Sequence, residues 1–263
     1  MRASGIITLL TDFGTRDAYV GIMKGVALGI CPAAQLVDLT HDVPPQAVRV
    51  GALLLRHAVD FFPGGTVHLA VVDPGVGSAR QPVLVVGERA FLVGPDNGLL
   101  APAAAALGVR AVHQLVRDEF FRRPVSQTFH GRDVFAPVAA HLAAGTPPHA
   151  FGPELPELQA LDLPEPRVEA GAVHGEVVYV DRFGNLVTNI PAAALASFHP
   201  QRLSVRIGDV TLSPLAPTYA AVAPGAPAAL VGSWRTLEVA VRDGNAADQL
   251  RAGITTRVTV VGE

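Results

Sequence analysis

Charged residues are scarce in this chain of 263 residues, and several features that mark large protein classes are missing. Lys and Arg number 20 and Asp and Glu number 23, so charged residues make up 16% of the sequence and the net charge is −3. This balance lacks the basic excess that binds nucleic acid. The single cysteine excludes an internal disulfide and a multi-cysteine zinc site.

Long hydrophobic runs are also absent, although hydrophobic residues make up 49% of the chain. The run at 67–72 ends at Asp73, and the run at 82–86 ends at Gly87. A membrane-spanning helix needs about 20 apolar residues, so we expect no membrane contact. The N-terminal residues show no signal-peptide pattern, which favours a cytoplasmic protein. The low charge indicates either a surface covered by a partner subunit or a bias towards Ala and Pro codons.

The first part of the chain alternates short apolar runs with amphipathic stretches. The runs expected to form buried strands are 6–10, 35–39, 67–72, 83–86 and 90–93. The stretches with helical spacing are 17–30, 45–61, 98–107 and 133–144. This alternation predicts an α/β domain over residues 1–150, with a mostly parallel sheet flanked by helices.

The pattern changes in the second part of the chain. Residues 151–168 are rich in proline and are expected to form a linker. Beyond it, strand-like runs follow one another at 172–180, 203–207, 228–231, 237–241 and 255–261. Helical spacing returns only in a short piece at 246–250. Residues 169–263 are therefore predicted to form a smaller, antiparallel, barrel-like β domain.

Acidic residues follow four of the expected strands of the first domain. They are Asp12, Asp42, Asp73 and Asp96, each in a loop with glycine, proline or both. Loops at the carboxyl ends of strands form the binding sites of α/β sheets. One such Asp is often only a turn former or a helix cap, but several in succession indicate a shared acidic pocket. Carboxylates suit ribose hydroxyls, amines or a cation, and the chain has no glycine-rich phosphate loop ending in lysine.

Three other features permit two interpretations each. His130 precedes an expected helix and can exchange a proton near neutral pH, or it is a partly buried structural histidine. His41 and Asp42 resemble a metal-binding pair of phosphohydrolases, but no second histidine lies at metal-binding spacing. The segment 181–185 belongs to a site or is an ordinary hairpin turn.

Six short motifs occur in a fixed order along the whole chain. They are TDFG at 11–14, DPGVG at 73–77, PDNG at 95–98, TFHGRD at 128–133, FGNLVTNI at 183–190 and GNAA at 244–247. With these motifs the chain resembles the S-adenosyl-L-methionine (SAM) hydrolases, also called SAM hydroxide adenosyltransferases, which are relatives of the fluorinase and the chlorinase. The resemblance implies hydrolysis of SAM to adenosine and L-methionine by attack of water or hydroxide at C5′. It implies no cofactor and no metal.

The resemblance also implies an assembly and a set of catalytic residues. The family forms homotrimers in which the β domain completes the active site of the neighbouring subunit. The Asp–Arg–His set that marks the hydrolases falls on Asp73, Arg80 and His130. The halogenases have a Tyr at the position of Asp73, and the fluorinase has a Tyr at that of His130, so this chain is similar to the hydrolases. Asp73 and His130 are both candidates to accept the proton of the attacking water.

Eight further positions are implied to bind the substrate. They are Asp12 for the ribose hydroxyls, Asp17 and Asp181 for the methionine amino group, Phe129 and Phe183 for the adenosine and C5′ region, Asn185 and the backbone near Ala246 for the adenine edge, and Ser233 for the methionine carboxylate. The sequence departs from the family around Ser233. Where the family often reads Asn-Ser-x-Gly-Tyr, residues 232–236 are Gly-Ser-Trp-Arg-Thr.

Three rival functions remain at this point. The first is a SAM-dependent halogenase. The second is a metal phosphohydrolase that uses Asp12, His41 and Asp42. The third is a protein that binds SAM or adenosine without turnover.

Overall fold

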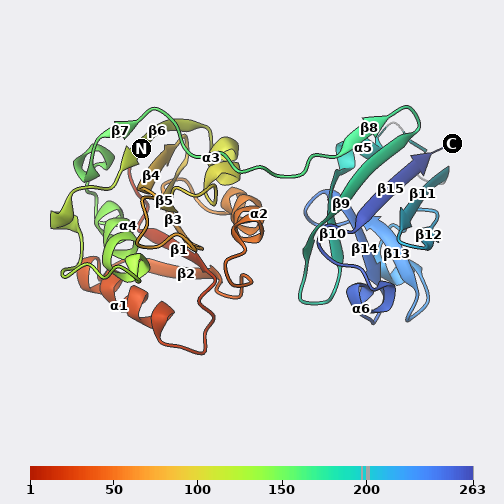
Figure 1. Ribbon diagram of the computed structural model, residues 1–263, viewed down its shortest axis with the longest axis horizontal. Coiled ribbons are helices and arrows are strands. Elements are labelled where there is room, and N and C mark those ends of the chain that lie inside the picture. The colour runs from red at the N-terminus through yellow and green to blue at the C-terminus, as the bar shows by residue number, and fades with distance from the viewer. Residues whose placement is uncertain (197, 200–201, 263) are drawn as a thin grey trace. The chain divides into compact units, whose positions relative to one another are not determined.

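The computed structural model describes residues 1–196, 198–199 and 202–262. The chain divides into two compact units, Met1–Asp162 and Leu163–Glu263 (Figure 1). Within the described residues, no helix is long and apolar enough to cross a membrane.

The first unit is built on a sheet of seven strands. They are β1 (Ile6–Thr11), β2 (Gln35–Thr40), β3 (Thr66–Val71), β4 (Pro82–Gly87), β5 (Ala90–Pro95), β6 (Val109–Gln114) and β7 (Glu154–Leu155). Their order across the sheet is β2-β1-β3-β5-β4-β6-β7. The strand β7 lies within the segment that was expected to be a linker and pairs with β6.

This sheet is mixed, so the expectation of a mostly parallel sheet holds only for one half of it. The strands β2, β1, β3 and β5 run parallel to one another, whereas the pairs β5–β4, β4–β6 and β6–β7 are antiparallel. The reason lies between β4 and β5, which only Glu88 and Arg89 separate. A connection of two residues can only join antiparallel strands, because a parallel crossover needs a dozen residues or more.

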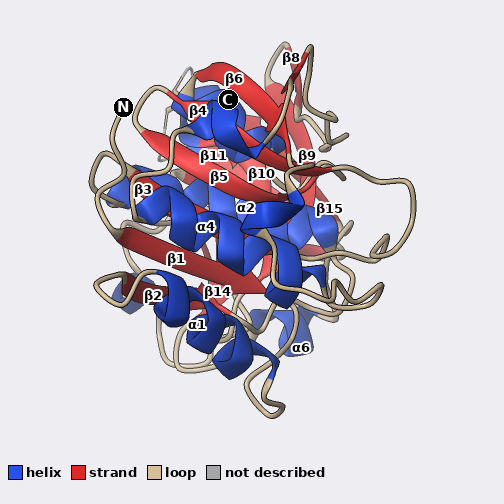
Figure 2. Cartoon of the chain, turned by 90° about the vertical axis from the view of Figure 1, so that its left-hand side faces the viewer, coloured by secondary structure: helices blue, strands red, loops and turns tan. Residues whose placement is uncertain are grey.

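Helices cover both faces of the first sheet (Figures 1 and 2). The four longer ones are α1 (Tyr19–Ile30), α2 (Val48–Ala58), α3 (Ala101–Leu107) and α4 (Ala136–Ala143). The short ones are η1 (Val59–Phe61), η2 (Asp118–Phe120), the π-helix η3 (Gly131–Phe135) and η4 (Pro148–Phe151). Helices α1 and α4 pack together on one face, and α2 and α3 pack together on the other. Fully buried side chains such as Met23, Leu9 and Leu69 fill the first of these layers.

The parallel half of the sheet gathers the acidic loops. Because β1 and β3 are parallel neighbours, the loops that begin at Asp12 and Asp73 leave the sheet at the same edge. The strand β5 is parallel to β3, so the loop with Asp96 leaves at this edge too. The sequence predicted these loops correctly, since the strands before them are continuous apolar runs.

The second unit is a curled antiparallel sheet. Its strands are β8 (Arg167–Glu169), β9 (Ala172–Val180), β10 (Leu186–Pro191), β11 (Leu203–Ile207), β12 (Val210–Leu212), β13 (Pro227–Val231), β14 (Thr236–Val241) and β15 (Arg257–Gly262). The order is β12-β11-β15-β9-β10-β14-β13, with β8 on β9. The end strands β12 and β13 contact each other, which nearly closes the sheet into the expected barrel-like form. The helical pieces are α5 (Ala192–Leu195), η6 (Tyr219–Ala221) and α6 (Ala246–Leu250).

Candidate active site

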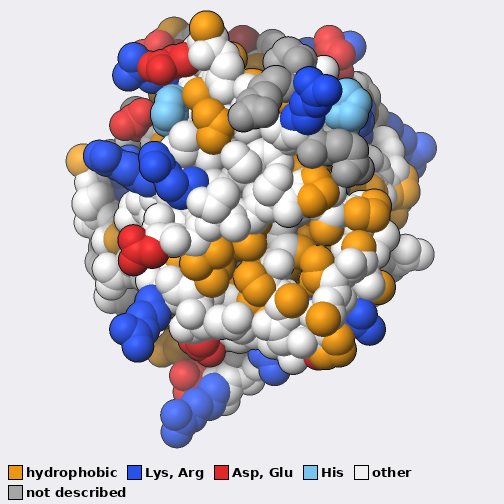
Figure 3. Space-filling view, turned by 90° about the vertical axis from the view of Figure 1, so that its right-hand side faces the viewer, with side chains coloured by type: hydrophobic (Ala, Val, Ile, Leu, Met, Phe, Trp, Pro, Cys, Tyr) orange, Lys and Arg blue, Asp and Glu red, His pale blue; other side chains and the backbone are white. Residues whose placement is uncertain are grey.

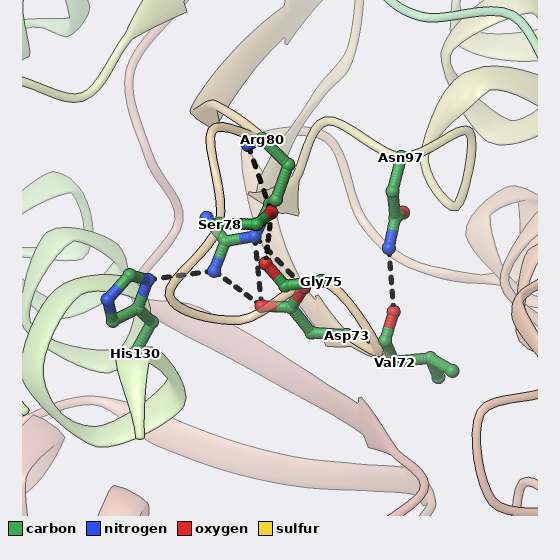
Figure 4. A network of polar contacts seen from close by, with 7 residues as sticks. All are labelled: Val72, Asp73, Gly75, Ser78, Arg80, Asn97 and His130. Atoms are coloured by element: carbon green, nitrogen blue, oxygen red, sulfur yellow. Dashed lines mark hydrogen bonds and ion pairs between the residues drawn. The ribbon is translucent and has the colours of Figure 1, made fainter. Parts of the chain in front are cut away.

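Asp73, Arg80 and His130 form one hydrogen-bonded network just past the end of β3 (Figure 4). Arg80 Nε donates to Asp73 Oδ1 at 2.9 Å and to Oδ2 at 3.1 Å, and Nη2 donates to Oδ2 as well. The same Nη2 lies 2.8 Å from His130 Nδ1. The guanidinium group therefore links a carboxylate to an imidazole. Arg80 thus contacts both of the other residues that the resemblance assigns to catalysis.

Glycine allows the loop from Asp73 to Arg80 to approach the loop before His130. Gly77 has φ +77°, and a Cβ atom at this position would lie 2.6 Å from the carbonyl oxygen of Gln127. Any side chain would therefore push the two loops apart. Within the first loop, the Ser78 hydroxyl donates to the Gly75 carbonyl at 2.6 Å. The two loops that carry the network are thus held against each other by close backbone contact.

The network is shielded from solvent. The side chains of Asp73 and Arg80 are 5% and 8% exposed. Burial and then the positive charge of Arg80 lower the pKa of His130, and the charges of Asp73 and Asp133 only partly counteract this. The ring is therefore neutral at neutral pH, and it accepts a hydrogen bond at Nδ1 because guanidinium can only donate.

One nitrogen of Arg80 is unused by the part of the chain that the structure describes. Nη1 is buried and has no hydrogen-bond partner there. The guanidinium carbon lies 5.3 Å from the centre of the Phe135 ring, so one side of the group faces an aromatic surface. A buried N–H without a partner costs about 1–3 kcal/mol, which a bound oxygen would recover.

Asp12 and Phe129 lie at the same end of the first unit. Asp12 Oδ2 accepts a hydrogen bond from the Gln46 backbone N–H at 2.8 Å. Phe129 belongs to an aromatic cluster, since its ring centre lies 5.9 Å from Phe13 and 5.2 Å from Tyr19. Tyr19 was not among the expected site residues, because its position at the start of α1 gives no chemical signal in the sequence. Asp17, which precedes it by two residues, is exposed.

In the second unit, Asp181 organises the turn that leads into β10. Its Oδ1 accepts from the backbone N–H groups of Phe183 at 2.9 Å and Asn185 at 2.8 Å. Its Oδ2 accepts from the Asn185 side-chain amide at 2.9 Å. This carboxylate therefore fixes the turn, which also confirms that the segment has hairpin geometry. Phe183 remains 75% exposed at the tip.

The turn is docked on the start of α6. Gly184 has φ +83°, and a Cβ atom there would lie 2.1 Å from Asn245 Oδ1. The Ala247 N–H donates to the Gly184 carbonyl at 3.0 Å. Ala246 lies fully buried between these residues. The FGN and GNAA motifs, about 60 residues apart in sequence, thus meet in one structure.

A pocket of about 800 Å³ opens beside this turn. The expected residues Asp181, Phe183, Asn185 and Ser233 line it, whereas Ala246 does not. Its lining also includes residues that were not expected as ligand contacts, namely Tyr179, Tyr219, Trp234 and Glu238.

These additional residues make the pocket both aromatic and acidic. Tyr179 and Trp234 stack with their ring centres 5.3 Å apart and an interplanar angle of 6°. Glu238 is 5% exposed and accepts a 2.6 Å hydrogen bond from the Tyr219 hydroxyl. Burial, together with the hydrogen bond to Glu238, raises the pKa of Tyr219 to about 12. Burial also raises the pKa of Glu238. An acid within the apolar strand 237–241 was the available signal in the sequence.

The pair His41 and Asp42 is not arranged as a metal site. His41 is buried, and its Nδ1 lies 2.8 Å from the Thr11 hydroxyl while Nε2 lies 2.9 Å from Asp38 Oδ1. Both ring nitrogens thus face partners of the chain. Among the residues that the structure describes, no group of three or more His, Cys, Asp or Glu side chains could hold a metal ion.

Comparison with known proteins agrees with the ordered motifs. The family models of the N- and C-terminal domains of SAM hydroxide adenosyltransferase match residues 7–152 and 175–259. The chain belongs to the SAM hydroxide adenosyltransferase family. It is 44% identical to a protein named (R)-S-adenosyl-L-methionine hydrolase from Salinispora tropica, over 95% of this chain and 94% of the relative.

Two other proteins are similar to the chain over nearly its whole length. The chain is 29% identical to a fluorinase of an Actinoplanes species, with 98% of this chain and 99% of the relative covered. A solved structure of a conserved protein from Thermotoga maritima superposes with a TM-score of 0.92 and 37% identity, covering 97% of this chain and 99% of that one. The fold of both units is therefore shared with this solved structure.

Proposed function

We propose that this member of the SAM hydroxide adenosyltransferase family hydrolyses SAM to adenosine and L-methionine. The observation that carries the proposal is the buried Asp73–Arg80–His130 network, in which the N–H at Arg80 Nη1 has no hydrogen-bond partner among the described residues. A water molecule fits such a site better than a halide does, because the network offers a carboxylate and an imidazole that can take part in proton transfer.

The reaction needs one nucleophile and no acid on the leaving-group side. The water oxygen forms a bond to C5′ as the bond between C5′ and sulfur breaks, and the bonding pair stays on sulfur. The sulfonium thereby becomes the neutral thioether of methionine. The proton lost by the water must go to a group of the protein. Positioning and proton removal then supply the rate enhancement, of which general base catalysis provides about 10²–10⁴-fold.

Asp73 is the better candidate to accept this proton. His130 Nδ1 already accepts from Arg80, so the neutral ring carries its proton on Nε2 and can only donate there. The oxygens of Asp73 keep free lone pairs although Arg80 donates to both of them. Arg80 stays protonated throughout, so its role is to orient the water and to stabilise hydroxide character.

The pocket of the second unit suits a cationic substrate. Acidic side chains and aromatic rings both attract a sulfonium or an ammonium group. We assign Asp12 to the ribose hydroxyls, Asp17 and Asp181 to the amino group, and Ser233 to the carboxylate of methionine. We assign the hydrophobic contacts with adenosine to Phe129 and Phe183. Asn185 and the backbone at Ala246 are assigned to hydrogen bonds with the adenine edge.

The proposal includes a homotrimer in which the second unit of one subunit completes the site of its neighbour. Apolar side chains at the surface of the first unit support an interface, among them Tyr19, Ile22 and Leu28 of α1 and Val37 of the edge strand β2. The face of the second unit drawn in Figure 3 also shows apolar side chains gathered between charged ones. Surfaces of this kind are usually covered in an oligomer.

Product analysis tests the activity. Purified protein is incubated with SAM, with and without chloride or fluoride in large excess over SAM, and the nucleosides are separated by chromatography. We expect adenosine and methionine in equal amounts under every condition. A 5′-halo-adenosine as the main product would make the protein a halogenase, and SAM binding without any product would leave only a binding protein.

Subunit mixing tests the shared site. An Asp73→Asn variant and an Asp181→Asn variant, each inactive, are unfolded together and refolded as mixed trimers. If each site combines two subunits, about one quarter of the sites regain both intact halves. No recovery of activity, although mixed trimers form, would place both halves of the site in one subunit.

A further inference from the structure

The segment between η2 and His130 forms no helix or strand, yet it contains the proposed site residue Phe129 and leads directly into His130. Residues 121–129 lie between η2 and η3 and form neither helix nor strand. His130 directly precedes the π-helix η3 and is its N-cap. A position this precise, 2.8 Å from Arg80, requires an anchor that secondary structure does not supply.

Asp133, in the first turn of η3, is fully buried and contacts this segment through its side chain. The guanidinium of Arg132 donates to both of its oxygens at 2.7 Å. The Ser126 backbone N–H donates to Oδ2 at 2.9 Å, and Arg122 Nη1 donates to Oδ1 at 3.3 Å. Burial alone would raise the pKa of Asp133, but the hydrogen bonds from Arg132 and Ser126 outweigh it and lower the pKa. Asp133 is therefore a buried anion with three separate partners.

These contacts extend to both halves of the catalytic network. The hydroxyl of Ser126, whose backbone is fixed by Asp133, accepts the Thr128 N–H at 3.2 Å. The next residue in this segment, Gln127, is the one whose carbonyl meets Gly77 of the Asp73–Arg80 loop. The anchored segment thus supports the arginine side of the network as well as the histidine.

Arg132 adds a second link. While it holds Asp133, its guanidinium carbon lies 5.1 Å from the centre of the Phe129 ring. The Phe129 carbonyl also accepts the backbone N–H groups of Arg132 and Asp133, each at 3.2 Å. The residue before His130 is therefore fixed at its ring and at its backbone.

We infer that Asp133 is a positioning residue, which holds the 121–129 segment through Arg132, Arg122 and the Ser126 backbone and thereby sets His130 against Arg80. The inference rests on the proposed function, since SAM hydrolysis is the reaction that the Asp73–Arg80–His130 network is proposed to catalyse. Asp133 does not touch the reacting atoms. Its effect on the reaction passes through the geometry of His130 and of the loop that carries Arg80.

The test compares two aspartates of the same region. Asp133→Asn removes the charge that holds two arginines. Asp118→Asn is the matched control, because Asp118 also pairs with an arginine, Arg123, but both side chains are more than 60% exposed. We expect kcat to fall about 10–100-fold in the first variant, with KM within about threefold, because misplacement by an ångström costs up to 10²-fold. The control keeps the parent values.

The pH profile adds a readout that loss of stability alone would not change. The charged groups around His130 are Asp73 and Arg80 from the loop after β3 and Arg132 and Asp133 from η3. Burial and then the charge of Arg80 lower the pKa of His130, and the charge of Asp133 raises it least. Displacement of His130 from Arg80 should therefore outweigh the loss of the Asp133 charge and move the contribution of His130 to the acid limb of the kcat profile to higher pH. An unchanged kcat and an unchanged acid limb in a folded Asp133→Asn protein would overturn the inference.

A spectroscopic readout separates this inference from the proposed function. Histidine ring ¹⁵N resonances of the substrate-free protein should show His130 with Nδ1 as a hydrogen-bond acceptor. This signature should be lost in Asp133→Asn and retained in Asp118→Asn, whether or not SAM is turned over. If Asp133→Asn does not fold, Arg132→Gln serves instead, since it keeps Asp133 and removes the two-pronged contact. An unperturbed His130 ring in that variant would equally contradict the inference.

Discussion

The two units of this protein each hold an acidic side chain in a different environment. In the first unit, the acid Asp73 is bound on both oxygens by Arg80, and the surrounding loops are locked by backbone contacts at Gly77. In the second unit, Glu238 lines a pocket of about 800 Å³ and accepts a hydrogen bond from the Tyr219 hydroxyl. The comparison teaches that an acid paired with a cation suits proton chemistry, whereas an acid hydrogen-bonded to a neutral hydroxyl among aromatic rings suits recognition of a cation.

The largest effect is expected from the paired acid of the first unit. Asp73→Asn should lower kcat about 10³-fold, because the amide cannot accept the proton of the attacking water. Adenosine affinity, measured by titration calorimetry, should change by less than about threefold, since the lost group serves chemistry. An equal loss of adenosine affinity and of rate would erase the distinction between the two units.

The second-largest effect on kcat is expected from the close contact at Gly77. Gly77→Ala places a Cβ atom 2.6 Å from the Gln127 carbonyl, so kcat should fall about 10²-fold as the loops separate. Gly14→Ala is the control, because Gly14 has a similar φ of +67° but no atom within 4 Å of a Cβ. Equal losses in both variants would mean that backbone strain, and not the contact between the loops, causes the effect.

Acid should weaken the first unit and spare the second. Burial lowers the pKa of His68, which is fully buried in β3, to about 4. The pKa of His68 in the unfolded chain is near 6.5. The free energy of unfolding that the neutral histidine contributes is therefore fully present above pH 6.5 and falls as the pH drops towards 4. By pH 5 the loss should be about 2 kcal/mol. In the second unit the raised pKa of Glu238 acts oppositely, because protonation relieves a buried charge.

Hydrogen exchange at pH 7 and pH 5 measures this difference. After correction for intrinsic rates, amides of β1 and β3 should lose protection at pH 5, whereas those of β14 should not. In a His68→Gln variant, β1 and β3 should show little change between the two pH values. Parallel loss of protection in both units would contradict the account.

The smallest expected effect concerns the pocket acid. Glu238→Gln keeps an acceptor for Tyr219 and removes the charge, so SAM affinity should fall about tenfold while that of neutral adenosine stays the same. S-adenosyl-L-homocysteine, which has the amino group but no sulfonium, distinguishes the two cationic groups. Asp209→Asn, an exposed acid elsewhere in the unit, is the matched control. An equal loss for adenosine would show that Glu238 shapes the pocket and does not recognise charge.

The sequence predicted the parts of the structure that depend on local pattern. Continuous apolar runs located β1 and β3, and the loops after them placed Asp12 and Asp73 at one edge of the sheet. The motifs placed Asp73, Arg80 and His130 in one site through the family resemblance, and Arg80 is hydrogen-bonded to both of the others. Asp181, Phe183 and Asn185 likewise share the turn in which they were expected.

Other features depend on contacts that local pattern cannot reveal. The mixed sheet arises from the short β4–β5 connection, which has none of the usual hairpin residues between Gly87 and Ala90. The strand β10 was not predicted, because Thr188 and Asn189 interrupt its apolar run. The role of Glu238 depends on its hydrogen bond with Tyr219, 19 residues away in sequence. The role of Asp133 depends on its contacts with a segment that has no secondary structure.

The origin of the 5′-oxygen tests the central claim most directly. The protein is supplied with SAM in ¹⁸O-enriched water, and the adenosine is analysed by mass spectrometry. The account predicts one ¹⁸O atom at the 5′ position of every adenosine formed, and none in methionine. Adenosine without label, or no turnover of SAM, would contradict the attack at C5′ of a water molecule positioned by the Asp73–Arg80–His130 network.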